Sequence, residues 1–160
     1  MKSLHALAAC LALLATGPAL AQTHKLKLGH ASSAESSQQV ALVKFAELVK
    51  ERSKGDVEIT VYPGSTLGPD AQLINLTRGG SIDIAVSGST NFNGMVAQTA
   101  ALELPFIFRD NKHAYDVLDG KVGQGLLDEL GQHKLKGLSY FENGWRVMTN
   151  KQRPMLTPEE

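Results

Sequence analysis

The sequence predicts an α/β fold built around a parallel sheet, and two observations support this prediction. Strand and helix patterns alternate strictly in the first half of the chain, in the order strand, helix, strand, helix, strand. The third strand pattern, residues 82–86, is almost continuously apolar, which is typical of a parallel strand covered on both faces. We expect right-handed crossovers between these strands.

The first strand and helix follow from two different periodicities. Leu26 and Leu28 alternate with lysines, which predicts a short strand that ends at Gly29. A small, polar loop over residues 30–37 leads into a helix whose apolar face repeats at i, i+3, i+4 and i+7. That face comprises Leu42, Phe45, Ala46 and Val49, and the helix ends at Lys54 and Gly55.

The next two elements are a second strand and a second helix. Val57, Ile59 and Val61 alternate with polar residues and predict a strand, which is followed by a turn at residues 63–65. A helix should run from about residue 69 to 78, because the glycine pair at 79–80 supplies the left-handed residue that ends helices.

The second half of the chain is predicted to be more irregular. We expect a polar loop over residues 87–98, and Pro105 makes the apolar stretch 102–108 a poor central strand. Residues 111–119 and 121–134 predict two short helices, and residues 138–141 and 147–149 predict two short strands. The second of these helices should bury Val122, Leu126, Leu127 and Leu130.

The first 21 residues have the layout of a secretory signal peptide. Lys2 precedes an apolar run too short to span a bilayer, and a small-residue site predicts cleavage after Ala21. A lipoprotein site at Cys10 is an alternative, but it would leave only a short apolar run before it. We therefore expect export to the periplasm as a soluble chain that loses Cys10, its only cysteine.

The last residues indicate that the chain is the front part of a longer protein. Thr157 and the Pro-Glu-Glu sequence after it form the start of a capped helix, with no helix sequence behind it. We expect residues 22–160 to be the N-terminal part of a binding domain. The formal charge of zero does not suit a nucleic-acid partner, which would require a clustered cationic face.

Three loops at the carboxyl ends of the predicted strands are the candidate ligand site. They span residues 30–37, 63–70 and 87–93, and they are rich in hydroxyl, amide and glycine groups. This composition suits a small polar solute or a carboxylate, although the same residue types fill ordinary loops. Arg146 adds a planar fork that can pair with a carboxylate, but a surface arginine beside a core Trp145 fits equally well.

No motif for catalysis, metal binding or a cofactor stands out. The histidines lack zinc-ligand spacing, and no nucleophile motif or phosphate-binding loop is present. A secreted hydrolase of small acids remains an alternative, with His30 and Asp70 as the pair it would use. A gene fragment without function is a further alternative.

Seven stretches together carry a family resemblance. In chain order they are LKLGH (26–30), KFAELV (44–49), YPGSTLGPD (62–70), GSIDIA (80–85), LPFIFRD (104–110), VLDGKVG (117–123) and NGWRVMTNKQRP (143–154). Their order and spacing resemble the solute-binding subunit of tripartite ATP-independent periplasmic (TRAP) transporters, the DctP-like family. The resemblance runs from residue 25 to the last residue.

The resemblance implies a two-lobed periplasmic-binding-protein fold that closes over a ligand, of which this chain is essentially the first lobe and the start of the crossover. It implies capture of an organic acid and delivery to a sodium-driven membrane permease by a monomeric protein without a cofactor. It places Arg146 of the Asn-Gly-x-Arg motif, which begins at Asn143, against the ligand carboxylate. It also assigns pocket roles to His30, Ala31, Asp70, Ser87, Gly88, Ser89 and Asn91. The family's second arginine would lie beyond Glu160, so we expect weak binding by these 160 residues alone.

Overall fold

The computed structural model describes residues 23–145, 149–151, 153 and 157. The chain divides into two compact units, Met1–Asn91 and Phe92–Glu160. Among the described residues, no helix has the length and apolar character needed to cross a membrane.

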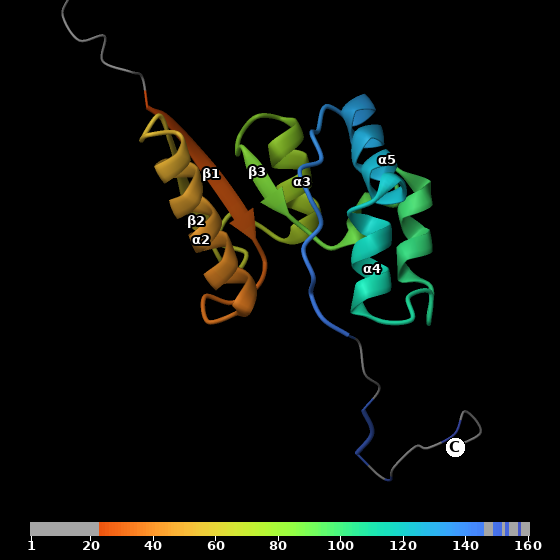
Figure 1. Cartoon of the computed structure of the whole chain (residues 1–160). Helices are drawn as coiled ribbons and strands as arrows, with labels where there is room; N and C mark the ends of the chain where they lie inside the picture. Colours follow the sequence, from red (N-terminus) through yellow and green to blue (C-terminus); the bar gives the residue numbers. More distant parts are fainter. Residues whose placement is uncertain (1–22, 146–148, 152, 154–156, 158–160) are drawn as a thin grey trace, which may run out of the picture. The chain divides into compact units, whose positions relative to one another are not determined.

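The first unit is a three-stranded parallel sheet with the strand order β2-β1-β3 (Figure 1). Its elements are β1 (His24–His30), α2 (Ser37–Arg52), β2 (Val57–Tyr62), α3 (Asp70–Arg78) and β3 (Ile84–Val86). In the register, Leu28 of β1 lies opposite Val61 of β2 and Ile84 of β3. The predicted α/β class is therefore confirmed.

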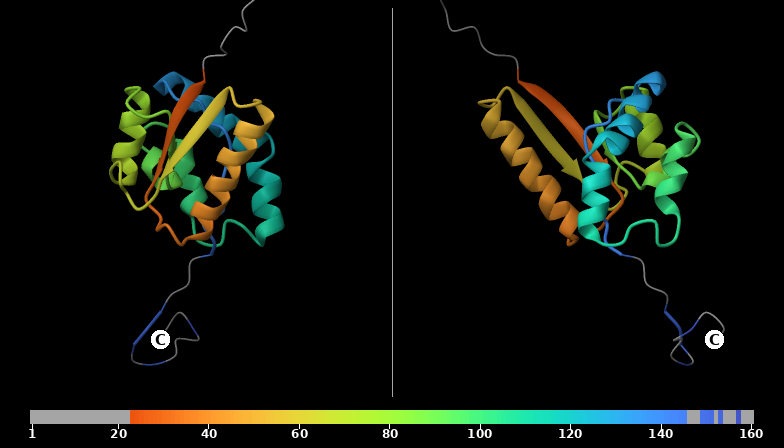
Figure 2. Two further views of the ribbon diagram at one scale, coloured as in Figure 1. Left: turned by 90° about the vertical axis from the view of Figure 1, so that its left-hand side faces the viewer. Right: turned by 45° about the vertical axis from the view of Figure 1, so that its right-hand side comes forward.

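Helices α2 and α3 cover opposite faces of this sheet, as two views show (Figures 1 and 2). A Cβ atom built on Gly29 would lie only 2.9 Å from Cδ2 of Leu73 in α3, so this face of β1 meets α3 directly. The next residue, His30, points to the other face, where it contacts Gln39 of α2. The core between the layers contains Leu28, Leu42, Leu73, Ile74 and Ile82.

Helix α2 confirms the predicted helix, with one difference in its apolar face. Ser36 caps the N-terminus by accepting a hydrogen bond from the Gln39 amide at 3.2 Å. Leu42 is buried, as predicted, but Phe45 remains 37% exposed. The predicted apolar stripe is therefore wider than the part that the sheet covers.

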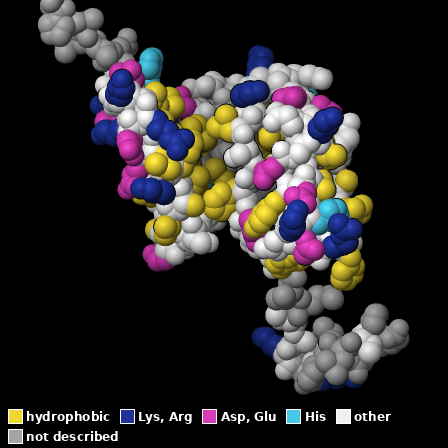
Figure 3. All heavy atoms as spheres, viewed as in Figure 1, with side chains coloured by type: hydrophobic (Ala, Val, Ile, Leu, Met, Phe, Trp, Pro, Cys, Tyr) yellow, Lys and Arg dark blue, Asp and Glu magenta, His cyan; other side chains and the backbone are white. Residues whose placement is uncertain are grey.

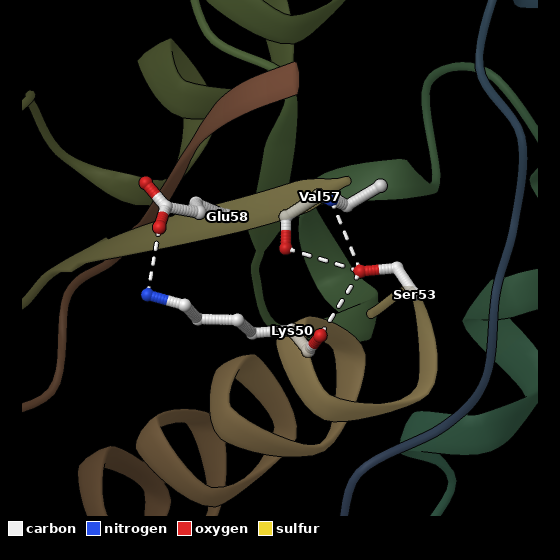
Figure 4. A network of polar contacts seen from close by, with 4 residues as sticks. All are labelled: Lys50, Ser53, Val57 and Glu58. Atoms are coloured by element: carbon white, nitrogen blue, oxygen red, sulfur yellow. Dashed lines mark hydrogen bonds and ion pairs between the residues drawn. The ribbon is translucent and has the colours of Figure 1, made fainter. Parts of the chain in front are cut away.

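The end of α2 is tied to the start of β2 by a small polar network (Figure 4). The Ser53 hydroxyl donates to the Lys50 carbonyl at 3.2 Å and accepts from the Val57 amide at 3.0 Å. The Lys50 ammonium pairs with the Glu58 carboxylate at 2.7 Å. This pair, through the hydrogen bond first and the opposite charge second, lowers the pKa of Glu58 below its ordinary value.

Strand β3 is shorter and less buried than predicted. It spans Ile84–Val86, and all three of its residues are half-buried. Ile82 is buried but precedes the strand. Asp83 explains the late start, because its carboxylate accepts the Lys27 amide at 2.8 Å and its own amide donates to the Lys27 carbonyl at 3.1 Å. The Asp83 side chain thus takes the Lys27 amide, which a longer β3 would bind through a backbone carbonyl.

The second unit is helical in the part of the chain that the structure describes. Its helices are η2 (Ala97–Glu103), α4 (Asn111–Leu118), α5 (Lys121–Glu129) and η3 (Leu130–His133), and η1 (Ser89–Phe92) crosses the boundary between the units. The predicted loop over residues 87–98 therefore contains short 3-10 segments. The predicted helix at 111–119 is confirmed as α4, and the one at 121–134 is found as α5 followed by η3. Asp110 caps α4 by accepting the His113 amide at 2.7 Å.

Two predictions for the second unit are wrong. Val122 is 61% exposed, whereas Leu130 is buried as expected. Residues 138–141 form no strand in the structure. Several apolar side chains reach the surface instead, including Phe106 at 96% exposure and Leu138 at 64%, and Figure 3 shows such surface groups. Most of the predicted strand 147–149 and of the helix start after Thr157 lies outside the described residues.

Candidate ligand-binding site at the carboxyl edge of the sheet

Seven of the predicted site residues follow the strand ends of the first unit. The strand order reverses at β1, because the chain crosses from β1 to β2 on one side and then to β3 on the other. In such sheets the carboxyl edge at the reversal is where ligands bind. His30 ends β1 opposite Val86 of β3, so the loop that begins at Ser87 lies beside it.

His30 is the most enclosed of these residues, with no exposed surface. Its Nε2 lies 2.7 Å from Oε1 of Gln39. Because an amide oxygen only accepts, Nε2 carries the proton in this arrangement, and the Nδ1 of a neutral ring is then an acceptor. Nδ1 is buried and has no hydrogen-bond partner among the described residues.

Backbone hydrogen bonds join the loops after β1 and β2. The Ser65 amide donates to the His30 carbonyl at 3.1 Å, and the Gly64 amide donates to the Ser32 carbonyl at 2.8 Å. Gly64 and Ser65 both have positive φ angles, 64° and 57°. This turn conformation suits glycine and is tolerated at Ser65, and it turns both amides toward the first loop. Ala31 lies in that first loop and is exposed.

Asp70 connects α3 to the loop after β3. It is the first residue of α3, where the helix dipole favours a negative charge. Its Oδ2 accepts a long hydrogen bond of 3.4 Å from the Gly88 amide. Its Oδ1 is buried and, like Nδ1 of His30, has no partner among the described residues.

The loop after β3 is held by its own polar groups. The Asn91 side chain donates to the Ser87 hydroxyl at 3.0 Å, and the Asn91 amide donates to the Gly88 carbonyl at 3.0 Å. Ser89 begins the 3-10 segment η1. Four of the predicted residues in this region, Asp70, Ser87, Gly88 and Asn91, are therefore connected through direct hydrogen bonds.

The Asn-Gly-Trp-Arg motif belongs to the second unit. Asn143 is exposed, and Arg146 lies outside the described residues, so its predicted contact with a carboxylate stays a prediction. Trp145 is 59% exposed, and its indole N–H donates to Oδ1 of Asn111 in α4 at 2.5 Å. Asn111 also donates to Glu142 at 3.4 Å, so this segment is fastened to α4.

The groups with shifted pKa values lie in other places than the predicted site. A hydrogen bond to Glu142 raises the pKa of Tyr115 above its ordinary value, and burial raises that of Tyr140. Among the described residues, no group of three metal-ligating side chains comes together.

Gln39 contacts the predicted residue His30 but was not itself predicted. It lies three residues after the N-cap Ser36, a spacing that matches a capping box in which the glutamine would return to the N-cap amide. In the structure its side chain binds His30. A polar residue at this helix position indicates that its side chain makes a hydrogen bond. The sequence does not show that the partner is His30, because that contact depends on how α2 packs over β1.

Comparison with known proteins agrees with this fold. The family described as "Bacterial extracellular solute-binding protein, family 7", DctP, matches residues 28–160. The 2,3-diketo-L-gulonate-binding periplasmic protein of Escherichia coli is 43% identical over 150 residues, which are 94% of this chain and 45% of that protein. The C4-dicarboxylate-binding protein of Bacillus subtilis is 31% identical, over 84% of this chain and 38% of its own length.

Solved structures give the same result. A TRAP periplasmic solute-binding protein from Ochrobactrum anthropi superposes with a TM-score of 0.81 at 34% identity, covering 84% of this chain and 42% of that one. A sugar acid binding protein from Advenella mimigardefordensis, in complex with galactonate, has a TM-score of 0.78 at 34% identity, covering 82% and 43%.

The chain thus spans less than half the length of these relatives. The family match nevertheless includes β1 from Leu28 onward, both sheet crossovers and the whole second unit. The fold, the order of the motifs and this match agree, and the chain belongs to the DctP family of bacterial extracellular solute-binding proteins.

Proposed function

We propose that this chain forms one ligand-binding part of a periplasmic solute receptor of the TRAP type, which captures an organic acid for uptake. The observation that carries the proposal is the polar edge of the first unit. There, His30, Asp70 and the loop after β3 lie at the reversal of strand order in the sheet. Similarity to proteins named for binding diketogulonate, C4-dicarboxylates and galactonate supports an acid as the ligand.

In this proposal the receptor binds and releases its ligand without changing it. The guanidinium of Arg146 pairs with the ligand carboxylate, Asn143 assists, and amides and hydroxyls of the loops bind the remaining groups. Closure of two lobes then encloses the acid, and the closed receptor docks on a membrane permease. The chain is exported through residues 1–21, is cleaved after Ala21 and acts as a monomer.

The hydrolase alternative receives no comparable support. It needs His30 as a base, but the His30 side chain has no exposed surface through which a substrate could reach it. A general base must lie within hydrogen-bond reach of the group that it activates. The family match, to solute-binding proteins, also points away from catalysis.

Removing the charge at Arg146 tests the proposal. The protein expressed from its complete coding sequence would be titrated calorimetrically with succinate, gluconate and a keto acid. Arg146→Ala should weaken binding of every acid by roughly tenfold to a hundredfold, because a charge-assisted hydrogen bond contributes about 1.5–3 kcal/mol.

Arg109→Ala is the matched control, because Arg109 is an exposed arginine of the same unit to which we assign no role. Its affinity should equal that of the unaltered protein. Equal affinities for Arg146→Ala and the control would contradict the assigned role, and turnover of ester or amide substrates would contradict the receptor function itself.

A further inference from the structure

The sequence contains two Asn-Gly pairs, Asn93-Gly94 and Asn143-Gly144, and both belong to the second unit. Asparagine is chemically labile, because the backbone nitrogen of the next residue can attack its side-chain amide. Glycine as the next residue favours this attack, since it has no Cβ atom to restrict the backbone. Both pairs therefore have the same intrinsic chemistry, and the structure around each pair determines which one reacts.

The first pair, Asn93-Gly94, is held in a hydrogen-bonded turn. The Met95 amide donates to the Phe92 carbonyl across the pair at 2.8 Å. The Thr99 hydroxyl, on a buried residue, donates to Oδ1 of Asn93 at 2.6 Å. The backbone and the side chain of Asn93 are thus both restrained. Attack on this side chain requires the turn to open and the amide to leave Thr99.

The second pair, Asn143-Gly144, has no such restraint. Both residues are exposed, and neither forms a hydrogen bond with another described residue. Gly144 has a φ of 88°, and a Cβ atom built on it would meet nothing within 4 Å. The residues on either side are fixed instead, because the side chain of Asn111 in α4 binds both Glu142 and Trp145. The pair is therefore presented to solvent between two anchored neighbours.

We propose that Asn143 is a site of spontaneous deamidation in this protein. The backbone nitrogen of Gly144 attacks Cγ of Asn143 and forms a C–N bond. The bond from Cγ to Nδ2 breaks, and the side-chain nitrogen leaves as ammonia with the proton from the Gly144 amide. Water then adds to either carbonyl of the resulting succinimide ring and opens it to aspartate or isoaspartate. Water is the co-reactant, and ammonia is the product released.

The reaction changes the charge beside a residue of the proposed ligand site. It places a carboxylate at position 143, three residues before Arg146. Isoaspartate also lengthens the backbone by a methylene group at this point. The consequence for binding rests on the proposed function, because an anionic ligand would then meet a like charge near the arginine. Deamidation of Asn143 therefore lowers the affinity of the receptor for organic acids as the protein ages.

Peptide mass spectrometry measures the rate at each pair. The protein from its complete coding sequence would be aged in warm, mildly alkaline buffer, and trypsin separates the pairs into the peptides 137–146 and 79–109. We expect Asn143 to deamidate about tenfold or more faster than Asn93, because Asn93 must first lose its hydrogen bonds. In guanidinium chloride the two rates should converge. Equal rates in the folded protein, or a difference that persists in the denaturant, would overturn the proposal.

Thr99→Val tests the protection of the first pair. Valine is close to threonine in shape but cannot donate to the Asn93 side chain, so deamidation of Asn93 should become faster. The rate at Asn143 is the internal control and should equal that of the unaltered protein, since Thr99 makes no contact with it. An unchanged rate at Asn93 would overturn the protective role assigned to Thr99.

Calorimetry on the separated forms tests the consequence for binding. Anion exchange separates the deamidated protein by its added negative charge, and both forms would be titrated with succinate and gluconate. The deamidated form and Asn143→Asp should each bind about tenfold or more weakly than the unaged protein. If the unaged protein binds no acid, the proposed function fails, and the peptide rates still decide the modification site. Equal affinity of the two forms would overturn the effect on binding.

Discussion

At the scale of single residues, the secondary-structure position of a residue was easier to predict than its hydrogen-bond partner. The sequence places His30 directly after a strand that ends at Gly29, and the structure extends β1 by one residue to include it. Its partner Gln39 could not be predicted, because the contact requires α2 to pack across the face of β1. Arg146 remains a prediction, since it lies outside the described residues.

Gly29 permits the close approach of α3 to the central strand. A methyl group at this position would lie 2.9 Å from Cδ2 of Leu73, which is itself fully buried and cannot move freely. Gly29→Ala should therefore lower the free energy of unfolding by about 1–3 kcal/mol, as overpacked cores do. Urea denaturation followed by circular dichroism measures this change.

Gly94→Ala is the control for this substitution, because a Cβ atom there meets nothing within 4 Å. Its stability should stay within about 0.5 kcal/mol of the unaltered protein, as expected for substitutions without a structural role. Equal stability of the two alanine variants would contradict the proposed contact with Leu73.

The ion pair between Lys50 and Glu58 predicts that the stability of the fold falls at acidic pH. Lys50 lowers the pKa of Glu58, so the pair stabilises the fold above the ordinary pKa of glutamate and this contribution is lost as pH falls through the lowered value. Lys50→Met keeps the aliphatic stem and removes the charge. In this variant the pKa of Glu58, measured by carboxyl ¹³C NMR titration, should rise toward its ordinary value.

Lys44→Met tests whether the effect is specific to this pair. Lys44 lies on the same helix but pairs with Glu47 at 3.1 Å. The titration of Glu58 should be unchanged in this control. A rise of equal size in both variants would indicate a general loss of positive charge.

At the scale of elements, regular periodicity was a reliable guide and irregular segments were not. Alternation and the glycine pair predict β2 and α3 with nearly correct bounds, because these signals come from the local chain. The strand predicted at 138–141 does not form, since a strand needs a neighbour that its own sequence does not encode. Val122 was misplaced for a related reason: a helix pattern does not reveal which apolar residues the neighbouring elements cover.

The connection between α2 and β2 depends on one hydroxyl. Ser53 accepts from Val57 and donates to Lys50, and it thereby sets the direction in which the chain leaves the helix. Ser53→Ala leaves the Val57 amide without this partner and should lower the free energy of unfolding by about 1 kcal/mol. Chemical denaturation checks the magnitude, and hydrogen exchange at the Val57 amide should become faster.

Ser37→Ala provides the matched control, because Ser37 is an exposed residue in the first turn of the same helix. Alanine has the higher helix propensity, so stability should be unchanged or slightly greater. If Ser53→Ala behaved in the same way, the described network would contribute nothing measurable.

At the scale of the whole molecule, the parallel sheet could be predicted from the alternation of its elements, but the division of the chain into two units could not. The boundary at Asn91 and Phe92 falls within a short 3-10 segment and is not marked by a proline-rich or glycine-rich linker. The strand order β2-β1-β3 likewise required the structure, because the handedness of the crossovers constrains the order without fixing it.

Ligand binding should stabilise the receptor as a whole. A ligand that binds only the folded state at one hundred times its dissociation constant adds about 2.7 kcal/mol. Differential scanning fluorimetry with a bound acid should therefore show a higher unfolding temperature, and the size of the shift should grow with ligand concentration. Arg146→Ala should show a smaller shift at the same acid concentration, because its affinity is roughly tenfold to a hundredfold lower. A full shift in this variant would contradict the ligand contact that we propose.

The central position of β1 determines when this sheet can be completed. Leu28 needs both Val61 and Ile84 as neighbours, so a growing or translocating chain must present residues up to Val86 before its first strand is enclosed. Contacts between such distant residues slow folding, and an apolar strand with open edges attracts chaperones or other chains in the meantime. Newly made protein should consequently need chaperones for longer. A protein in which each strand pairs with the strand made just before it needs them for a shorter time.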